Sequence, residues 1–399
     1  MRKKNIAIII QLLKGGGAER VAANMSIEFE EKYNVYLVVF DASEAVYPYG
    51  GTLINLNIPP VKSGSALKHI SNIIKRTHAL RKFKKNYKID CSISHMENAS
   101  VVNILSKCKD RIISVFHTMP SIGVKKNAFN VVLHNFIGRF SYRYIFVSKL
   151  AAQNVVNEFF VPKKKVECIY NFCDIGKITE QANEEIDNIE ANRFLKEHDK
   201  IIINMGRLNK LKGQRNLIRA FCSVKRKFPQ SGLIILGEGN ERKYLEELVK
   251  KLGLNRDVYM PGAISNPFPY IKRADAFVLS SFYEGLPMSL IEAAACECPV
   301  ISTDMLSGAR EILAPDTDIN YTTDNKEYAK YGILVPVCSD APNDDNEFSR
   351  NEEILAEAIE DMLKNNGMCQ KYIKRSNECA KSFSPEAIAK QWYKLIEDK

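Results

Sequence analysis

The sequence predicts an α/β protein made of two doubly wound parallel-sheet domains. Apolar, β-branched runs alternate with helix-like patterns along both halves of the chain, as is typical of parallel strands joined by crossover helices. A length of 399 residues exceeds that of one ordinary domain, so two domains are expected. A hydrophobic content of 45% is enough for two sizeable cores.

Short β-branched runs mark the predicted strands. In the first half they span residues 5–10, 34–40, 90–94, 111–116 and 144–148. In the second half they span residues 200–206, 232–237, 257–262, 275–281 and 298–303. Residues 174–200 are polar and charged with no strand signal, so we expect the linker there, between domains of residues 1–176 and 177–382. A second polar stretch, residues 339–353, is expected to be an exposed loop before a helix.

The N-terminal sequence MRKKNIAIIIQLLKGGG joins basic residues to an apolar run, as a signal peptide does. It continues into a glycine loop and a helix pattern without a small-residue cleavage site, so a buried first strand is the better interpretation. No apolar run approaches the roughly 20 residues that a membrane-spanning helix needs. The ten cysteines are scattered without the spacing of a zinc site or a disulfide framework, which indicates reduced thiols in a cytoplasm.

Charge is unevenly distributed between the two halves. Residues 1–178 contain 27 Lys and Arg against 12 Asp and Glu, a net charge of +15, whereas the remainder contains 30 against 35, a net of −5. The asymmetry indicates that the first half meets an anionic partner. No recognised nucleic-acid motif accompanies the charge, so nucleic acid is not an expected partner.

The most basic stretch is residues 61–88, with nine Lys and Arg and no acidic residue. Its apolar residues recur at helical spacing: Leu67, Ile70, Ile73, Ile74, Leu80 and Phe83, with Thr77 among them. Such a helix either packs on a core with a merely basic outer face or lies on an anionic membrane. We expect both for the helix at about residues 66–88.

Glycine loops follow the first predicted strand of each half. In GGG (15–17), Gly16 and Gly17 allow the backbone to approach a ligand at a helix N-terminus, although a tight turn is the alternative. In GRLNKLKG (206–213), Gly206 precedes Arg207, and Lys212 follows five residues later. Two cations on one loop can bind a diphosphate, or they can be ordinary surface charges.

The stretch EGLPMSLIE (284–292) places two acids eight residues apart. We expect a helix to begin at Leu286-Pro287, because proline suits the first helical turn. Glu284 then lies in the preceding loop and Glu292 about five residues inside the helix, roughly 7.5 Å along its axis. Carboxylates accept hydrogen bonds from paired sugar hydroxyls, and the N–H groups at Gly285 and Leu286 can bind sugar or phosphate oxygens. A helix that simply starts with an acid is the alternative.

Together these motifs carry a family resemblance. GGGAER (15–20), GRLNKLKG (206–213), LGEGNERKYLEELVKKLGL (236–254) and EGLPMSLIEAAACECPVIST (284–303) with SGAREIL (307–313) resemble a GT4-type retaining glycosyltransferase of the GT-B fold. The resemblance covers most of the chain and is strongest over residues 200–313. VECIYNFCD (166–174) also resembles the family's strand that enters the linker. It implies two Rossmann-like domains that face each other across a cleft, the first completed by a C-terminal helix of about residues 383–399.

The resemblance also implies roles for individual residues. Glu284 would contact the hydroxyls of the donor sugar, and Glu292 the ribose of the nucleotide. Arg207 and Lys212 would bind the diphosphate, with the backbone at Gly16-Gly17 completing the phosphate site. The donor is then a nucleotide-sugar, and no cofactor is expected.

In the first half, two predicted strands are followed by histidines, His95 and His117. By the resemblance His117 would meet the donor sugar, whereas we expect His95 to be a capping histidine bound to backbone. Glu97 and Asp110 are carboxylates without a context that makes either one a nucleophile. The acidic pair in Asp316-Thr317-Asp318 lies in a polar insertion and not at a strand end, so we expect no metal there. The resemblance then implies retention on one face of the sugar, with the leaving phosphate helping to deprotonate the acceptor.

We therefore expect a metal-independent transferase that moves a hexose or N-acetylhexosamine from a nucleotide-sugar to a growing glycan. A UDP-sugar is the expected donor. A lipid-linked acceptor for a bacterial capsule or lipopolysaccharide fits the basic first half, as does a peripheral position at the inner face of the cell membrane. An epimerase or phosphorylase on the same fold and a non-enzymatic basic binding protein are the alternatives. The insertion at residues 314–331 departs from the shorter segment usual in the family, and its role stays open.

Overall fold

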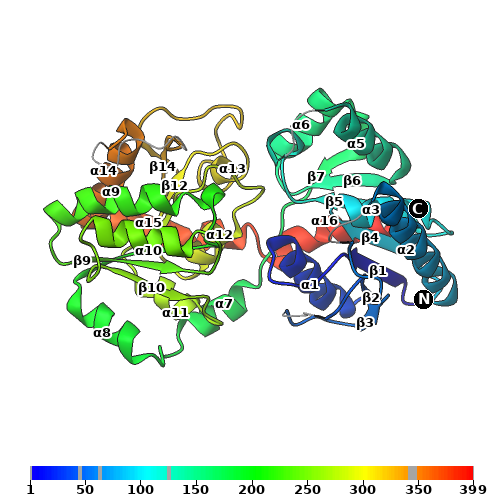
Figure 1. The fold of residues 1–399 in the computed structure, drawn as a ribbon, viewed down its shortest axis with the longest axis horizontal. Helices are drawn as coiled ribbons and strands as arrows, with labels where there is room; N and C mark the ends of the chain where they lie inside the picture. Colours follow the sequence, from blue (N-terminus) through cyan, green and yellow to red (C-terminus); the bar gives the residue numbers. More distant parts are fainter. Residues whose placement is uncertain (1, 44–46, 62–64, 124–126, 340–347, 399) are drawn as a thin grey trace. The chain divides into compact units, whose positions relative to one another are not determined.

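Each half of the chain forms a seven-stranded sheet with helices on both faces (Figure 1). The computed structural model describes residues 2–43, 47–61, 65–123, 127–339 and 348–398. The chain divides into two units: unit 1 comprises Met1–Phe172 with Ile388–Lys399, and unit 2 comprises Cys173–Ala387. The predicted fold class, two Rossmann-like parallel-sheet domains, is confirmed.

The sheet of unit 1 is parallel throughout, in the order β3-β2-β1-β4-β5-β6-β7. Its strands are β1 (Asn5–Ile10), β2 (Asn34–Val39), β3 (Thr52–Asn55), β4 (Cys91–His95), β5 (Arg111–Phe116), β6 (Arg143–Phe146) and β7 (Val166–Cys168). The inner strands are buried on both faces, which explains their near-continuous Ile and Val runs.

The helices of unit 1 form two layers. Its elements are α1 (Gly17–Glu30), α2 (Ala66–Asn86), α3 (Glu97–Leu105), α4 (Pro120–Gly123), α5 (Ala128–Phe140), α6 (Lys149–Phe159), the short 3₁₀ turn η1 (Lys163–Lys165) and α16 (Pro385–Glu397). Helices α2, α3, α5 and α6 contact one another in sequence and cover one face. Because α1 connects strands in the opposite direction along the sheet, the right-handed crossover rule puts it on the other face. There Phe29 of α1 packs against Trp392 and Tyr393 of α16.

The sheet of unit 2 has the order β10-β9-β8-β11-β12-β14-β13, and only β13 is antiparallel to its neighbour. Its strands are β8 (Lys200–Met205), β9 (Ser231–Leu236), β10 (Val258–Gly262), β11 (Ala276–Leu279), β12 (Val300–Thr303), β13 (Glu327–Tyr328) and β14 (Ile333–Val335). Every strand predicted from the sequence is present, with ends that differ by at most two residues. The short strands β3, β13 and β14 were not predicted.

The helices of unit 2 are α7 (Ile175–Ala182), α8 (Ile189–Glu197), α9 (Gln214–Lys227), α10 (Arg242–Lys251), α11 (Phe268–Lys272), α12 (Met288–Ala295), α13 (Ala309–Leu313), α14 (Arg350–Lys364) and α15 (Asn366–Lys381), with the 3₁₀ turn η2 (Lys210–Lys212). Helix α14 packs on α9, and α15 packs on α12 (Figure 1). No helix in the described part of the chain is both long enough and apolar enough to cross a bilayer.

The stretch predicted as a linker, residues 174–200, is instead helical and belongs to unit 2. It contains α7 and α8, whose buried residues include Ile178 and Phe194. The sequence hides these helices because each has only two buried positions among polar residues. The predicted loop at 339–353 lies mostly outside the described residues, and α14 begins at Arg350.

Both sheets reverse their strand order next to their first strand. In unit 2 the reversal lies between β8 and β11, and in unit 1 between β1 and β4. Ligands of doubly wound sheets bind outside the carboxyl ends of strands at such reversal points. The loops after β8 and β11 are therefore the first place to look for a site in unit 2.

One ion pair of unit 1 is fully buried. Lys84 of α2 lies 2.8 Å from Asp110, which precedes β5, and neither side chain is exposed to solvent. Asp110 also accepts a hydrogen bond of 2.6 Å from Ser92, and Lys84 donates to Asn103. Asp110 therefore anchors α2 at the amino end of β5. In a parallel sheet this is the edge opposite the carboxyl ends of the strands, where ligands bind.

Replacing Lys84 with Met should lower the free energy of unfolding by about 3–5 kcal/mol, because Asp110 would remain buried without a counter-charge. Urea denaturation of purified protein measures the change. The exposed pair Lys243–Glu247 supplies the control, since Lys243→Met removes a lysine from a solvated helix face and should leave stability little changed. A loss below about 1 kcal/mol for Lys84→Met would contradict the anchoring role.

Candidate active site

The loops after β8 and β11 are fastened to each other at the reversal point of unit 2. The N–H of Phe282 donates to the carbonyl of Leu211 at 2.8 Å, and the Ser280 hydroxyl donates to the carbonyl of Lys212 at 3.0 Å. Gly213 has φ +62°, and a Cβ there would fall 2.1 Å from the Ser280 carbonyl oxygen. A glycine is therefore required where the two loops meet.

This arrangement brings together two residues that the sequence predicts for one site, Lys212 and Glu284. The Lys212 Nζ donates to Glu284 Oε1, and the Ser281 hydroxyl donates to the same oxygen at 3.0 Å. Both side chains are partly exposed, at 23% and 16%, so solvent or a ligand can reach them. A cation and a carboxylate that contact each other on facing loops can each bind a different part of one polar ligand.

Gly206 and Arg207 lie beside this pair on the same loop. A Cβ on Gly206 would stand 3.5 Å from Cδ of Lys212, so the glycine lies directly alongside the lysine side chain. The Arg207 side chain is exposed, while its carbonyl accepts a hydrogen bond of 3.2 Å from the buried Gln214. The loop therefore holds its backbone firmly and leaves the guanidinium at the surface.

The second predicted acid, Glu292, is the fifth residue of α12 and is only 3% exposed. The helix begins at Met288 with Pro287 as its N-cap, so the predicted start at Leu286 is about two residues early. Within the described residues, the backbone N–H groups of Gly285 and Leu286 donate no hydrogen bond. These donors precede the helix in two buried residues, and because no described protein group accepts from them, a ligand oxygen can.

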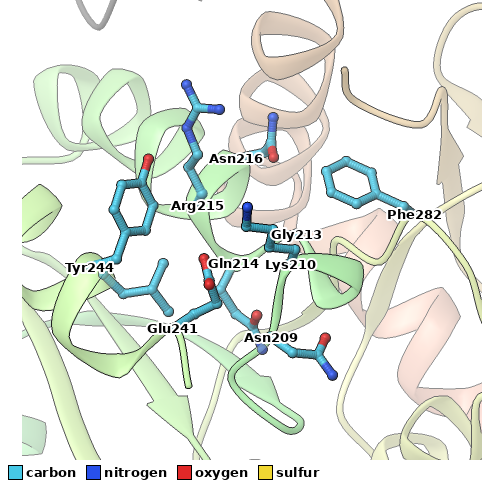
Figure 2. A pocket seen from close by; sticks show the side chains of 10 residues that line it. Asn209, Lys210, Gly213, Gln214, Arg215, Asn216, Glu241, Tyr244 and Phe282 are labelled. Carbon is cyan, nitrogen blue, oxygen red and sulfur yellow. The ribbon is translucent and has the colours of Figure 1, made fainter. Parts of the chain in front are cut away.

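A cavity of about 410 Å³ lies beside the loop after β8 (Figure 2). Its lining comes from the loop, the first turns of α9 and α10, and Phe282: Asn209, Lys210, Gly213, Gln214, Arg215, Asn216, Glu241, Tyr244, Leu245 and Phe282. Figure 2 shows Tyr244 and Phe282 on opposite sides of it. None of Arg207, Lys212, Glu284 and Glu292 lines this cavity, so it is distinct from the Lys212–Glu284 contact.

In unit 1 the two predicted histidines meet. His95 Nδ1 and His117 Nε2 are 2.8 Å apart, and the two rings stack with an interplanar angle of 16°. The expectation that His95 bonds backbone is therefore wrong, because its partner is the other imidazole. Burial lowers the pKa of His117 to about 4 and also lowers the pKa of His95, so both rings are neutral near pH 7 and one donates to the other.

The glycines at residues 15–17 form the predicted turn into α1. Gly16 is the N-cap of α1 without a side-chain cap, and Gly17 is the first helical residue. A Cβ on Gly16 would fall 2.0 Å from a Glu19 carboxylate oxygen, so this carboxylate folds back over the helix N-terminus. Gly17 has open space around its Cβ position.

The remaining acidic candidates divide by environment. Asp110 is the buried partner of Lys84 described above, and Glu97 begins α3, where burial raises its pKa. In the insertion, Asp316 pairs with Lys330 at 3.4 Å, and Asp318 accepts hydrogen bonds from Asn320. Neither acid of that triplet contacts the Lys212–Glu284 pair.

Three residues next to this site, Ser281, Ser307 and Arg310, have no role predicted from the sequence. Ser281 donates to Glu284, while Ser307 and Arg310 belong to a network around the loop at residues 285–287. Ser307 and Arg310 lie inside the SGAREIL motif, which the sequence pattern marks without indicating what each member contacts. Ser281 ends a predicted strand run, and its position at a strand end is the one signal that points to it.

Comparisons with known proteins agree with this fold. The family model described as "Glycosyl transferases group 1" matches residues 185–331, and that described as "Glycosyltransferase Family 4" matches residues 15–177. An uncharacterized glycosyltransferase of Methanocaldococcus jannaschii is 34% identical over 352 residues, covering 84% of this chain and 86% of the relative. A Campylobacter jejuni protein, "N-acetylgalactosamine-N,N'-diacetylbacillosaminyl-diphospho-undecaprenol 4-alpha-N-acetylgalactosaminyltransferase", is 29% identical and covers 98% of this chain and 99% of its own.

Among solved structures, Anabaena HepE in complex with UDP-glucose superposes with a TM-score of 0.75. It is 17% identical and covers 99% of this chain and 100% of its own, so the likeness concerns the fold. A lipopolysaccharide outer core galactosyltransferase, WaaB, gives a TM-score of 0.65 at 17% identity, covering 98% of this chain and 99% of its own.

The neutral histidine pair predicts how stability depends on pH. The unfolded chain protonates histidine near pH 6.5, whereas folded His117 resists protonation until about pH 4. The contribution of His117 to the free energy of unfolding should therefore be fully present above pH 6.5 and should decline as pH falls toward 4. Replacing His117 with Asn should make that decline shallower in urea titrations between pH 7 and 4.5.

His134, whose pKa burial also lowers to about 4, contributes its own share to the wild-type slope and remains in the variant. An unchanged slope in His117→Asn would mean that His117 is not held neutral.

Proposed function

Because the chain belongs to the GT4-type group 1 glycosyltransferases of the GT-B fold, we propose that it moves a hexose or N-acetylhexosamine from a nucleotide-sugar to a growing glycan with retention of configuration. A UDP-sugar is the proposed donor, as the solved Anabaena neighbour holds UDP-glucose. A lipid-linked saccharide is the proposed acceptor, since the name of the Campylobacter jejuni relative carries a diphospho-undecaprenol saccharide. The product is a bacterial surface polysaccharide.

The contact between Lys212 and Glu284 is the observation that carries this proposal. A departing nucleoside diphosphate gains negative charge as the sugar becomes oxocarbenium-like, and fixed cations must stabilise it. Lys212 and the exposed Arg207 supply those cations from one loop, without a metal or another cofactor. Once Lys212 turns to the diphosphate, the Glu284 carboxylate is released to accept hydrogen bonds from the sugar hydroxyls.

The other predicted residues keep the roles that the family resemblance implies. Glu292 holds the ribose from α12, and the N–H groups of Gly285 and Leu286 bind oxygens of the nucleotide-sugar. His117 meets the donor sugar as a neutral ring, and the turn at Gly16-Gly17 contributes backbone donors to the phosphates. The acceptor hydroxyl loses its proton to the leaving phosphate, on the same face of the sugar.

Helix α2 supports a peripheral position at the inner face of the cell membrane. Its apolar stripe divides: Leu80 and Phe83 are buried, whereas Leu67, Ile70 and Ile74 are 76%, 52% and 62% exposed. Two of its cations, Arg76 and Lys84, are also buried, and the others in the helix face solvent: Lys68, Lys75, Arg81, Lys82 and Lys85. Exposed apolar and cationic side chains on one helix match an anionic bilayer surface.

A panel of nucleotide-sugars tests the proposed activity. Release of nucleoside diphosphate that an acceptor increases would support a transferase, and mass spectrometry of the product would identify the sugar. Interconversion of the donor sugar would point to an epimerase instead. If no nucleotide-sugar gives either result, the remaining interpretation is a non-enzymatic binding protein with the same fold.

The site predicts a clear mutational pattern. Lys212→Ala and Glu284→Ala should each reduce turnover on the order of 100- to 1,000-fold, the usual loss when one group that stabilises developing charge is removed. Thermal unfolding should stay near wild type, because both side chains are partly exposed. Lys210→Ala, an exposed lysine of the same loop, is the matched control and should retain activity. Near-normal turnover in either site variant would remove the site assignment.

The membrane role has its own test. Reversing Lys75, Arg81, Lys82 and Lys85 to Glu should abolish co-sedimentation with vesicles of phosphatidylglycerol, because each near-surface cation contributes roughly 1 kcal/mol of attraction. An equal number of reversals on the exposed face of α10, at Lys243, Lys250 and Lys251 with Arg226 of α9, controls for total charge. Equal binding by the two variants would count against a specific role of α2.

A further inference from the structure

The insertion at residues 314–331 folds back onto one buried arginine, Arg310 of α13, which is 3% exposed. Arg310 donates to the Thr317 hydroxyl at 3.0 Å and to both carboxylate oxygens of Glu327, at 3.1 and 2.6 Å. Its guanidinium also lies 4.8 Å from the ring centre of Tyr321. Three separate points of the insertion thus converge on a single side chain, and the insertion is an ordered part of unit 2.

The same arginine fixes the end of strand β12. Arg310 Nη2 donates to Asp304 Oδ2 at 2.5 Å, and the Thr323 N–H donates to that oxygen at 2.7 Å. The Asp304 N–H in turn donates to the carbonyl of Val335 in β14 at 2.7 Å. Both ends of the segment 304–310 are therefore tied, one by the sheet and the insertion and the other by Arg310.

Between these ties the segment touches the proposed donor loop. The Ser307 hydroxyl donates to the carbonyl of Gly285 at 2.8 Å. A Cβ on Gly308 would fall 2.7 Å from the carbonyl oxygen of Gly285 and 3.0 Å from Cα of Leu286, so the two backbones pack closely against each other. Ser307 has φ 77°, a left-handed conformation that costs free energy in a residue other than glycine and persists only where its surroundings impose it.

The hydrogen bond from Ser307 to the Gly285 carbonyl also fixes the orientation of the neighbouring N–H group, that of Leu286. The C=O of Gly285 and the N–H of Leu286 belong to one planar peptide unit, in which they point in opposite directions. A hydrogen bond that fixes the carbonyl therefore also fixes the direction in which the Leu286 N–H points. That N–H is one of the groups proposed to bind the donor.

We propose that the 314–331 insertion is a positioning element for the donor site. Acting through Arg310, it holds Ser307 in its strained conformation, and Ser307 orients the Gly285–Leu286 peptide. Arg310, Glu327 and Ser307 are positioning residues, since none of them is placed against the substrate. The inference rests on the proposed function for its effect on catalysis. The coupling between the insertion and the Gly285–Leu286 peptide does not depend on that function.

Hydrogen exchange tests this coupling in the absence of a nucleotide-sugar. Gly285 and Leu286 are both buried, so their amides are shielded from solvent until the loop opens. In Glu327→Gln, which weakens the bond to Arg310 at nearly constant shape, the loop should open more often, and these two amides should exchange faster by about 2- to 100-fold, the range for coupled neighbours. Tyr328 is the matched control, because it follows Glu327 in the same strand and its hydroxyl donates instead to Asp361 of α14 at 2.6 Å. Tyr328→Phe should leave those two amides unchanged.

Ser307→Ala removes only the last link and should accelerate the same two amides while the fold stays intact. Arg310 is itself buried, so replacing it would test folding as well as coupling, and Glu327→Gln and Ser307→Ala decide the question instead. Unchanged exchange at Gly285 and Leu286 in both variants would overturn the proposal, as would equal acceleration in Tyr328→Phe.

A double-mutant cycle adds the catalytic readout. If the insertion acts through Ser307, Glu327→Gln should lower kcat/KM in the wild-type background and have little further effect in Ser307→Ala. Losses that multiply independently would mean that the insertion does not act through this path. A protein that turns over no donor but shows the predicted exchange pattern would keep the coupling and lose the proposed function, so the two failures are distinguishable.

Discussion

The proposed donor site depends on one contact, the ion pair between Lys212 and Glu284 where the strand order of unit 2 reverses. The two residues are 72 positions apart in sequence. They meet because β8 and β11 are neighbours in the sheet, so that the loops after both strands leave the same edge. The topology therefore brings a cation to a carboxylate, and the absence of side-chain bulk at Gly213 lets the two loops close on each other.

The neighbouring structure fixes that contact and keeps it open to a ligand. Ser281 orients the Glu284 carboxylate, Gln214 fixes the backbone of Arg207, and Ser307 holds the peptide after Gly285. Preorganisation of this kind is what catalysis of charge separation requires, because groups already in place need no reorganisation when charge develops. The insertion at residues 314–331 is proposed to add to this preorganisation. It contacts the buried Arg310, and Arg310 supports the strained conformation of Ser307.

Much of this was predictable from the sequence, and the limits are physical. β-Branched runs buried on both faces predicted every inner strand except β14, because near-continuous apolar runs are typical of parallel strands that helices cover on both sides. The edge strands β3 and β13, the three-residue inner strand β14 and the helices α7 and α8 were missed, since each buries few side chains. For the site, spacing predicted the loop position of Glu284 and the helical position of Glu292. No local pattern could predict that His95 pairs with His117 or that Glu327 reaches Arg310, because those contacts depend on tertiary packing.

A structure of the protein with a nucleotide-sugar, or with the nucleoside diphosphate alone, tests the central claim most directly. We expect diphosphate oxygens within hydrogen-bond distance of Lys212 Nζ and the Arg207 guanidinium, and we expect Glu284 to contact the sugar hydroxyls in place of Lys212. A nucleotide seated instead in the cavity between Tyr244 and Phe282, with the Lys212–Glu284 pair undisturbed, would contradict it.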